Sequence, residues 1–565
     1  MITAEAEAAG PARSSHAVNW GRLLALLALA AALKLTFEGL GVVPFNADEA
    51  VVGLMARHIL QGERPVFFYG QAYLGSLDAW LTAGAFALLG QSVFALRLVQ
   101  LALYLGTVAT TYALGLKIYR SQWLAGAAAL FMVVPSVLVT LYTSATLGGY
   151  GEALLFGNVI LWLALDLPTQ SAAGGRWAGW RGWLGWGLFG LLAGLAFWTF
   201  PITLAYTLPA LIYVVVAVGR SWARLALIAV LVALGGAVGA APWLAYTAAH
   251  GAITVAETGG AAIRGASSPL LLLAAFEHLF NFLLFGPTVV WGMRPPWSAT
   301  FLALPLLPFA LAMQIGATGV GLRRLVYRRD AAAPGRRLLA GVMVLTVAAF
   351  VFSPFGADPS GRYFLPLAVP VALFLAETLH WFRLRRRQQA RRSLWRKWFG
   401  QVLALGLVAF YWWGNVQAAA AYPPGFTTQF DAVARVDPRP LPELMTFLRA
   451  QGETRGYTNY WVEYPLAFAS HEELLFVAQL PYHEDFRHTD RDSRIAAYEA
   501  AVAESPRVAY ITTRHPELDS QIRSGLRSLN VTFSERAFGD YHVFYGLSRR
   551  VTPDEFSFGL DCCKP

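Results

Sequence analysis

Two adjacent carboxylates, Asp48 and Glu49, lie directly after the first apolar segment of the chain. A carboxylate at the boundary between lipid and water is partly desolvated, and desolvation makes it a better proton acceptor. Such a group can take the proton of a hydroxyl while a lipid-borne substrate approaches from the side. The pair therefore indicates acid–base chemistry at a membrane surface. The structural alternative is that Asp48 caps a helix and that Glu49 favours the helix dipole.

The composition is that of a protein embedded in a membrane. Of the 565 residues, 56% are hydrophobic and 14% are charged, and the mean hydropathy is +0.48. These values are too apolar for a soluble globular protein. The net charge of +10 comes from Arg and Lys clustered in short loops between apolar runs, which argues against nucleic acid as a partner. The only cysteines, Cys562 and Cys563, exclude a disulfide framework and a cysteine metal site.

Apolar runs that can cross a bilayer, for which roughly 17–25 residues are needed, occur eleven times. They lie near residues 20–43, 92–115, 123–141, 152–166, 183–199, 201–219, 225–244, 298–320, 338–353, 363–381 and 398–418. We interpret residues 1–19 as a disordered cytoplasmic tail and the first run as a retained signal anchor. With the N-terminus inside, the inner loops hold most basic residues, above all 323–337 and 383–397. An odd number of spans then places the C-terminal portion outside.

The connecting segments predict further elements. Outer loops at 44–91 and 245–297 contain the amphipathic stretches Asp48–Gln61, Ser76–Leu89 and Leu270–Phe285, which we expect to lie along the membrane interface. The alternative is that these stretches are re-entrant or spanning. Residues 422–565 have the composition of an extracytoplasmic α/β domain, and about 140 residues can bury a core of their own. Its predicted strands are Gly456–Trp461 and Val508–Thr513, with helices at Pro440–Gln451, Arg494–Glu504 and Pro516–Leu529 and a hairpin formed by Val531–Arg536 and Tyr541–Leu547.

Several short motifs occur in a characteristic order. They are Ala47-Asp48-Glu49-Ala50, Leu60-Gln61-Gly62, Pro65, Trp80 before Gly90, Ala95-Leu96-Arg97-Leu98 and Gly361-Arg362-Tyr363-Phe364-Leu365-Pro366. This order resembles the GT-C glycosyltransferases. It is most similar to family 39, which includes protein O-mannosyltransferases and bacterial aminoarabinose transferases acting on lipid A.

The resemblance implies a polytopic α-helical GT-C fold of about 11 transmembrane helices with a C-terminal α/β domain. It implies inverting transfer of a sugar from a polyprenyl-phosphate donor to a hydroxyl acceptor at the outer face of the plasma membrane. The acceptor would be a glycan, lipid or protein. Asp48 matches the general base of the family, and Glu49 matches the acid that follows it in many members. No obligatory cofactor is implied beyond the lipid-linked donor.

The chain departs from the family pattern between Tyr69 and Trp80, where many bacterial members carry a lysine suited to bind phosphate and this chain has none. By topology, Arg362 and Arg264 are the outer cations best placed to bind the donor phosphate instead, while Arg97 is predicted to be structural. The residues that we expect to contact substrate are Tyr69, Gln71, Tyr73, Glu152 and Tyr363. For the loop residues an equally good interpretation is an ordinary interfacial or solvated role.

No metal is predicted to be obligatory. The first outer loop has no Asp-x-Asp motif, and His483-Glu484-Asp485 with His488 lacks zinc-type spacing and is interpreted as a solvated loop. No phosphate-binding or dinucleotide fingerprint occurs. Two other functions stay open: transfer of a larger lipid-linked glycan, and a non-enzymatic transporter or assembly protein. A transporter should show charges deep in several spans, where this chain has few.

Overall fold

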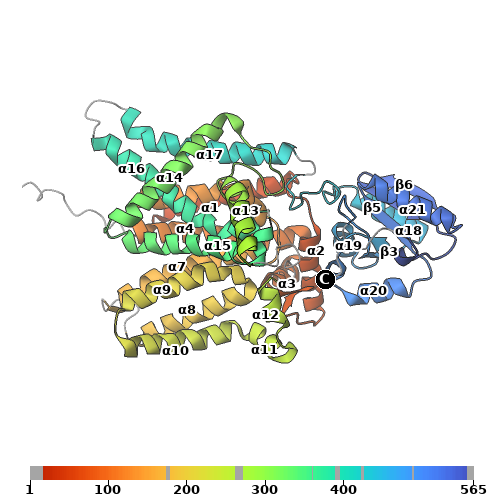
Figure 1. Ribbon diagram of the computed structural model, residues 1–565, viewed down its shortest axis with the longest axis horizontal. Coiled ribbons are helices and arrows are strands. Elements are labelled where there is room, and N and C mark those ends of the chain that lie inside the picture. The colour runs from red at the N-terminus through yellow and green to blue at the C-terminus, as the bar shows by residue number, and fades with distance from the viewer. Residues whose placement is uncertain are drawn as a thin grey trace, which may run out of the picture.

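A computed structural model describes residues 17–172, 179–260, 271–358, 360–388, 395–421, 425–486 and 489–556. A long bundle of helices is joined at one end to a smaller region that contains a five-stranded sheet (Figure 1). Within the described ranges, eleven helices are long and apolar enough to cross a membrane. The chain is a multi-pass membrane protein, and the predicted fold class is confirmed.

The helices of the bundle and its connections follow one another in chain order. They are α1 (Trp20–Gly39), α2 (Ala47–Leu60), α3 (Leu77–Leu89), α4 (Val93–Tyr119), α5 (Gln122–Val133), α6 (Val137–Tyr142), α7 (Tyr150–Ala172), α8 (Trp180–Thr199), α9 (Leu204–Val218), α10 (Trp222–Gly239), α11 (Ala241–His250), α12 (Ile253–Thr258), α13 (Leu271–Val290), α14 (Leu307–Tyr327), α15 (Ala333–Val351), α16 (Ala368–Gln388) and α17 (Trp395–Ala421). A short 3₁₀ helix, η5 (Arg362–Leu367), leads into α16.

Two elements differ from their predictions. The span expected at 123–141 is divided into α5 and α6 by a segment that contains Pro135, which has no N–H to continue a helix. The stretch Leu270–Phe285, expected at the interface, belongs to α13, whose residues Leu272–Val290 meet the length and hydropathy of a span. Its exposed apolar side chains, including Phe276 and Leu283, suit contact with lipid. In Figure 1, α13 is steeply inclined to α7, α9 and α10. By length and hydropathy, the eleven candidate helices therefore include α13 and do not include α5.

The ends of the bundle differ in charge. The helices α2, α3, α11 and α12 gather at the end that adjoins the C-terminal sheet, and the α9–α10 and α14–α15 turns lie at the opposite end (Figure 1). Those turns carry Arg220 and the run Arg323 to Arg329. This is the asymmetry that the positive-inside rule describes.

Small residues allow the closest contact between two of the helices. A Cβ atom at Gly190 of α8 would lie 2.2 Å from the Val232 carbonyl oxygen, and one at Gly239 of α10 would lie 2.1 Å from that of Leu191. Without a hydrophobic driving force in lipid, helix association depends on such close packing. The glycine-rich sequence of these spans therefore has a packing role.

The C-terminal region, residues 425–556, is built on a sheet of order β4-β3-β5-β7-β6. Its elements are α18 (Leu441–Gln451), β3 (Arg455–Thr458), α19 (Tyr460–Ala469), β4 (Leu475–Ala478), α20 (Ala496–Ala503), β5 (Ala509–Thr513), α21 (Pro516–Ser528), β6 (Ser534–Phe538) and β7 (Tyr541–Tyr545). Strand β3 pairs in parallel with β4 and β5, and β7 pairs antiparallel with β5 and β6. The predicted hairpin is confirmed and turns at Gly539, whose φ is +56°.

The sequence interpretation missed α19 and β4. The strand predicted to run to Trp461 ends at Thr458 because Asn459 caps a helix: its side chain accepts a hydrogen bond from the Trp461 N–H at 3.0 Å. Helix α19 is the element through which the C-terminal region reaches the first loop.

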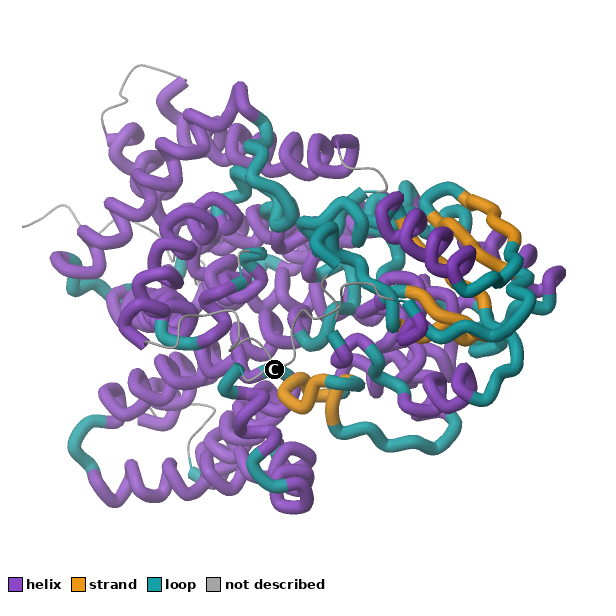
Figure 2. The backbone as a smooth tube through the Cα atoms, turned by 45° about the vertical axis from the view of Figure 1, so that its right-hand side comes forward, coloured by secondary structure: helices purple, strands orange, loops and turns teal. Residues whose placement is uncertain are grey.

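Helix α2 is buried along most of its length between α3 and α19. Phe468 of α19 packs on Phe45 and on Phe86 of α3, and a Cβ atom at Gly53 of α2 would lie 2.6 Å from the Phe468 ring. The hairpin of β1 (Phe67–Phe68) and β2 (Gln71–Gly75) continues the same loop, between the bundle and the C-terminal region (Figure 2). The first loop, residues 44–91, is therefore held between these two parts of the molecule.

Candidate active site

Asp48 lies in the first turn of α2 but does not cap it. The cap is Asn46, whose side chain accepts a hydrogen bond from the Glu49 N–H at 3.1 Å. The Asp48 carboxylate, whose side chain is 27% exposed, is free for other contacts. Tyr460 of α19 donates a hydrogen bond to Asp48 Oδ1 at 2.5 Å, and Arg494 Nη2 lies 3.8 Å from the same oxygen.

Glu49 points elsewhere, since successive residues on a helix diverge by about 100°. Its carboxylate is fully buried and accepts two hydrogen bonds from Arg97 of α4, at 3.0 and 2.8 Å. Arg97 also donates to Glu38 of α1 at 2.5 Å, and the Thr146 N–H donates to Glu49 at 3.3 Å. Burial raises the pKa of Glu49, and the Arg97 guanidinium opposes this rise. These contacts hold the first turn of α2 against the bundle, in line with the structural role expected for Arg97.

Arg362 begins η5 and is held from one side. Its Nη2 lies 2.6 Å from Asp358 Oδ2, and its guanidinium lies 5.1 Å from the centroid of the Tyr363 ring. The side chain stays 39% exposed, and Nε has no hydrogen-bond partner among the described residues. Arg362 is therefore oriented but has donors to spare.

The hydroxyl of Tyr73, in β2, is influenced by the charges of several of these residues. Burial raises the pKa of its hydroxyl, the charges of Arg362 and Arg494 lower it, and that of Asp48 raises it. The charges of Arg362, Arg494, Asp48 and Glu257 therefore all act on this one hydroxyl. Aromatic rings complete the surroundings: Tyr73 packs on Phe355 at 6.3 Å, and Phe355 packs on Tyr363 at 4.9 Å.

Arg494 was not predicted. It lies between β4 and α20 and stacks on two aromatic rings, at 4.9 Å from the centroid of Phe68 and 4.6 Å from that of Tyr460. Its position 446 residues after Asp48 explains the omission, since nothing in the local sequence signals such a distant contact. The sequence interpretation placed Arg494 in a helix that in fact begins at Ala496.

A second pair of acids, Asp78 and Glu152, is fully buried. Asp78 Oδ1 accepts a hydrogen bond from the Ala79 N–H at 2.8 Å, and the backbone N–H groups of Gly149 and Gly148, two consecutive glycines with φ near +79° and +88°, also favour its charged form. One Asp78 oxygen and both Glu152 oxygens have no partner in the described part of the chain. Burial raises the pKa of Asp78 to about 7, although the glycine N–H groups oppose it. The predicted residue Glu152 thus has an acidic neighbour that sequence reasoning missed.

The remaining predicted residues lie apart or outside the described ranges. The Tyr69 hydroxyl donates to Glu63 at 2.6 Å and lies 3.0 Å from His58 Nδ1, away from Asp48. Gln71 is the first residue of β2 and is half-buried. Arg264 falls within 261–270, outside the described residues, as does His488. His483 pairs with Asp431, and in the described ranges no three His, Cys, Asp or Glu side chains stand together as a metal site.

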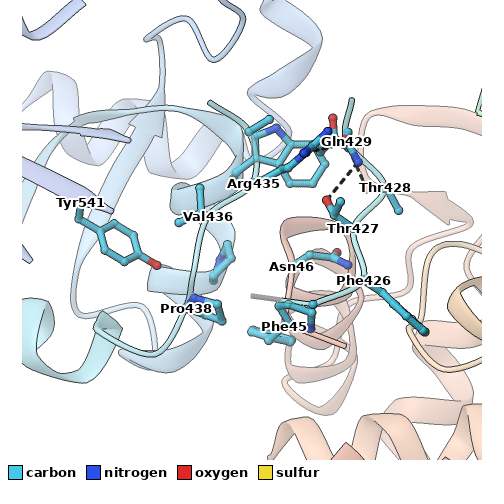
Figure 3. A pocket seen from close by; sticks show the side chains of 15 residues that line it. Phe45, Asn46, Phe426, Thr427, Thr428, Gln429, Arg435, Val436, Pro438 and Tyr541 are labelled. Atoms are coloured by element: carbon cyan, nitrogen blue, oxygen red, sulfur yellow. Dashed lines mark hydrogen bonds between the residues drawn. The ribbon is translucent and has the colours of Figure 1, made fainter. Parts of the chain in front are cut away.

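Two cavities adjoin the site. One of about 40 Å³ lies at the seam between the first loop and the C-terminal region, where Asn46, Thr427 and Tyr541 are among its lining residues (Figure 3). It has room for a few water molecules rather than a sugar. The other, about 280 Å³ and almost wholly apolar, is lined by α13, α14, α15 and α16 and includes Leu367, the last residue of η5. Its scale and lining suit part of a hydrocarbon chain.

Comparisons of the whole fold identify the class. The chain is similar to ArnT from Cupriavidus metallidurans bound to undecaprenyl phosphate, with a TM-score of 0.55, 13% identity and coverage of 94% of this chain and 99% of that chain. It is also similar to the Archaeoglobus fulgidus oligosaccharyltransferase in the apo form (TM-score 0.52, 13% identity, 87% and 69% covered). The same holds for AglB from that organism with an inhibitory peptide and a dolichol-phosphate (TM-score 0.52, 12% identity, 94% and 74% covered). No family model and no curated protein matches the sequence.

These neighbours share the GT-C fold of membrane glycosyltransferases, and the chain described here has that fold. The GT-C fold predicted from the ordered motifs is therefore confirmed.

Proposed function

We propose that this protein is an inverting glycosyltransferase that moves a sugar from a polyprenyl-phosphate donor to a hydroxyl acceptor at the outer face of the membrane. The observation that carries the proposal is a carboxylate, Asp48, oriented by Tyr460, together with Arg362 at the start of the short helix whose last residue lines an apolar cavity, on a GT-C fold. Each component matches one part of such a donor and its reaction.

The reaction needs a base for the acceptor. The Asp48 carboxylate takes the acceptor proton as the hydroxyl oxygen forms a bond to the anomeric carbon of the sugar. General-base assistance of this kind typically contributes about 10²–10⁴-fold to the rate. Tyr460, which donates a hydrogen bond to Asp48, orients the carboxylate.

The reaction also needs a cation for the leaving group. The bond between the anomeric carbon and the phosphate oxygen breaks, and its electron pair stays on the phosphate, which becomes a dianion. Arg362 stabilises the added charge, since its side chain is partly exposed and its Nε has no partner among the residues that the structure describes. The products are the glycosylated acceptor, polyprenyl phosphate and the proton held by Asp48.

The apolar cavity can bind the isoprenoid chain of the donor. Leu367 lines the apolar cavity and lies five residues after Arg362, about 10 Å along a 3₁₀ helix at ~2 Å per residue. A donor with its phosphate at Arg362 can therefore extend its first isoprene units into this cavity. The orientation that fits is the one predicted from the loops, with the N-terminus inside and residues 425–556 outside.

The test is a donor-dependent transfer assay combined with the identification of the acceptor. Envelope glycans of cells with and without the protein are compared to find the acceptor, and membranes are then given a labelled polyprenyl-phosphate sugar. We expect transfer of label and release of polyprenyl phosphate only where the protein is present. Arg362→Ala should weaken donor binding by about 10-fold or more, as expected for loss of a charge-assisted contact. Identical envelope glycans, with no transfer from any such donor, would overturn the proposal.

A further inference from the structure

We infer that Arg494, supplied by the C-terminal region, is the second ligand of the donor phosphate and faces Arg362 across the site. The C-terminal region is then part of the active site rather than an appended module. This inference rests on the proposed function and names a residue that neither the sequence nor the comparisons indicate.

The first reason is that Arg494 is buried with its donors unused. Its side chain is 7% exposed, and Nε and Nη1 have no hydrogen-bond partner among the described residues. Nη2 lies 3.8 Å from Asp48, which is too long for a hydrogen bond. Buried donors are nearly always paired, and each one left unpaired costs about 1–3 kcal/mol or more when it is charged. An anion with several oxygens would satisfy these N–H groups.

The second reason is that Arg494 is held in place by contacts that do not use its donors. The guanidinium lies over the rings of Phe68 and Tyr460, and Gly70 in the β1–β2 turn approaches it closely. Gly70 has φ +74°, and a Cβ atom there would lie 3.0 Å from Arg494 Cγ. A ligand-binding arginine fixed by packing loses little entropy when the ligand arrives.

The segment that carries Arg494 is also anchored. Arg491 forms a bidentate ion pair with Glu257 of α12, at 3.1 Å for both contacts. The Arg494 N–H donates to the Tyr464 hydroxyl at 2.8 Å, and this hydroxyl donates to the Asp492 carbonyl at 2.6 Å. The loop thus presents Arg494 to the first loop from a rigid base.

The third reason is the relation to Arg362. The β1–β2 hairpin lies between the two: Arg494 stacks on Phe68 of β1, and Tyr73 of β2 packs on Phe355. Phe355 in turn packs on Tyr363, whose ring lies beside the Arg362 guanidinium, so a phosphate at Tyr73 has an arginine on either side. The hairpin under Arg494 and the start of α3 carry no lysine between Tyr69 and Trp80. Arg494 therefore brings a cation to a part of the site that has none of its own. Two guanidinium groups can bind different oxygens of one phosphate and stabilise the dianion that leaves.

The experiment measures lipid binding in detergent micelles, which needs neither sugar nor acceptor. The probes are undecaprenyl phosphate and undecaprenol, which differ only in the phosphate. We expect Arg494→Ala and Arg494→Gln to weaken undecaprenyl phosphate binding at least 10-fold and to leave undecaprenol binding unchanged. The affinity of Arg494→Lys for undecaprenyl phosphate should fall between those of these variants and the wild type, since lysine keeps the charge but cannot form the two parallel hydrogen bonds of a guanidinium.

The matched control is Arg449→Ala, which removes another arginine of the C-terminal region, one that is partly exposed and is paired with Glu473 away from the site. It should change the affinity less than twofold. Thermal unfolding of every variant identifies any that is misfolded, and the conservative Arg494→Lys and Arg494→Gln variants are compared if Arg494→Ala is unstable.

Repeating the measurement in an Asp48→Asn protein distinguishes phosphate binding by Arg494 from a role as the counterion of Asp48. If Arg494 only neutralised Asp48, Arg494→Ala would have no effect on binding in an Asp48→Asn protein. We expect the loss to persist there. Binding by Arg494 variants equal to wild type, while Arg362→Ala is weakened, would overturn this inference and leave the proposed function intact. Unchanged binding in both the Arg362 and Arg494 variants would overturn the proposed function itself.

Discussion

Helix α2 makes two polar contacts with the C-terminal region, one at each end, and they are built differently. In the clasp at its last turn, Glu472 accepts hydrogen bonds from Arg57 at 3.2 Å, from His58 at 2.9 Å and from Tyr498 at 2.7 Å. At its first turn, Asp48 meets Tyr460 and Arg494, and two buried N–H groups of Arg494 have no partner in the described ranges. The clasp is saturated and the first-turn contact is open. Saturation indicates a structural contact, and an open buried contact indicates a missing ligand.

The largest effect should follow from separating the two parts of the molecule at Gly53. A leucine at this position collides with Phe468 and displaces α19, and with it Tyr460. Overpacking typically costs 1–3 kcal/mol, and a displacement of about 1 Å at a reacting group can lower the rate about 100-fold. We expect Gly53→Leu to lose most transfer activity and to lower the unfolding temperature. The control is Gly84→Ala in α3, because a Cβ atom added there would have no neighbour within 4 Å. Equal losses in both variants would contradict this packing argument.

Breaking the clasp should affect stability more than donor binding. Glu472→Ala removes the acceptor of Arg57 Nη1 and the partner of His58 Nε2, and an unsatisfied partly buried donor costs about 1–3 kcal/mol. Thermal unfolding should show this loss while the affinity for undecaprenyl phosphate changes less than about threefold. Glu473→Ala is the matched control, because its exposed ion pair with Arg449 is worth about 0–1 kcal/mol. A large loss of lipid affinity in Glu472→Ala with normal stability would reverse the assignment of the two contacts.

The clasp should also give a distinctive pH dependence. Although burial alone would raise it, hydrogen bonds from His58, Tyr498 and Arg57 lower the pKa of Glu472 from 4.5 to about 2. The stabilisation is therefore complete above about pH 4.5 and is lost as the pH falls from there towards 2. Unfolding temperatures measured between pH 6 and pH 3 should fall less steeply in Glu472→Gln than in the wild type. Parallel curves would show that Glu472 is not held in its charged form.

The buried acid Asp78 should change the pH dependence of stability in the opposite direction. Its pKa is raised from 3.8 to about 7, so the folded protein keeps a proton that the unfolded chain loses. Its contribution makes stability fall as the pH rises from about 4 to about 7. Asp78→Asn should remove this part of the pH dependence. If the slope of stability against pH is the same in Asp78→Asn as in the wild type, other groups cause this pH dependence.

The sequence predicted the parts of the fold that depend on local pattern. Hydropathy located ten of the spans, and the ordered motifs identified the class of fold. It failed at one predicted span, which a segment that contains Pro135 divides into two short helices. The strand predicted to reach Trp461 also ends three residues early, because Asn459 caps a helix there despite the β-forming residues that follow it.

Only part of the candidate site could be predicted from the sequence. Asp48, Tyr73, Arg362 and Tyr363 are brought together as neighbours, because the motifs that contain them mark the loop and helix ends of the fold. Arg494 and Asp78 were missed because their significance comes from burial and from distant partners, which no local pattern records. The neighbouring acids Asp48 and Glu49 look equivalent in sequence, and only the packing of Arg97 against Glu49 separates them.

The central claim is that Asp48 removes the acceptor proton, and Asp48→Asn tests it most directly. Donor binding and transfer are measured side by side on the folded variant. Because asparagine cannot take a proton, transfer should fall by about 10²–10⁴-fold, while undecaprenyl phosphate still binds at least as tightly as in the wild type. Transfer at the wild-type rate by a folded Asp48→Asn protein would contradict the account.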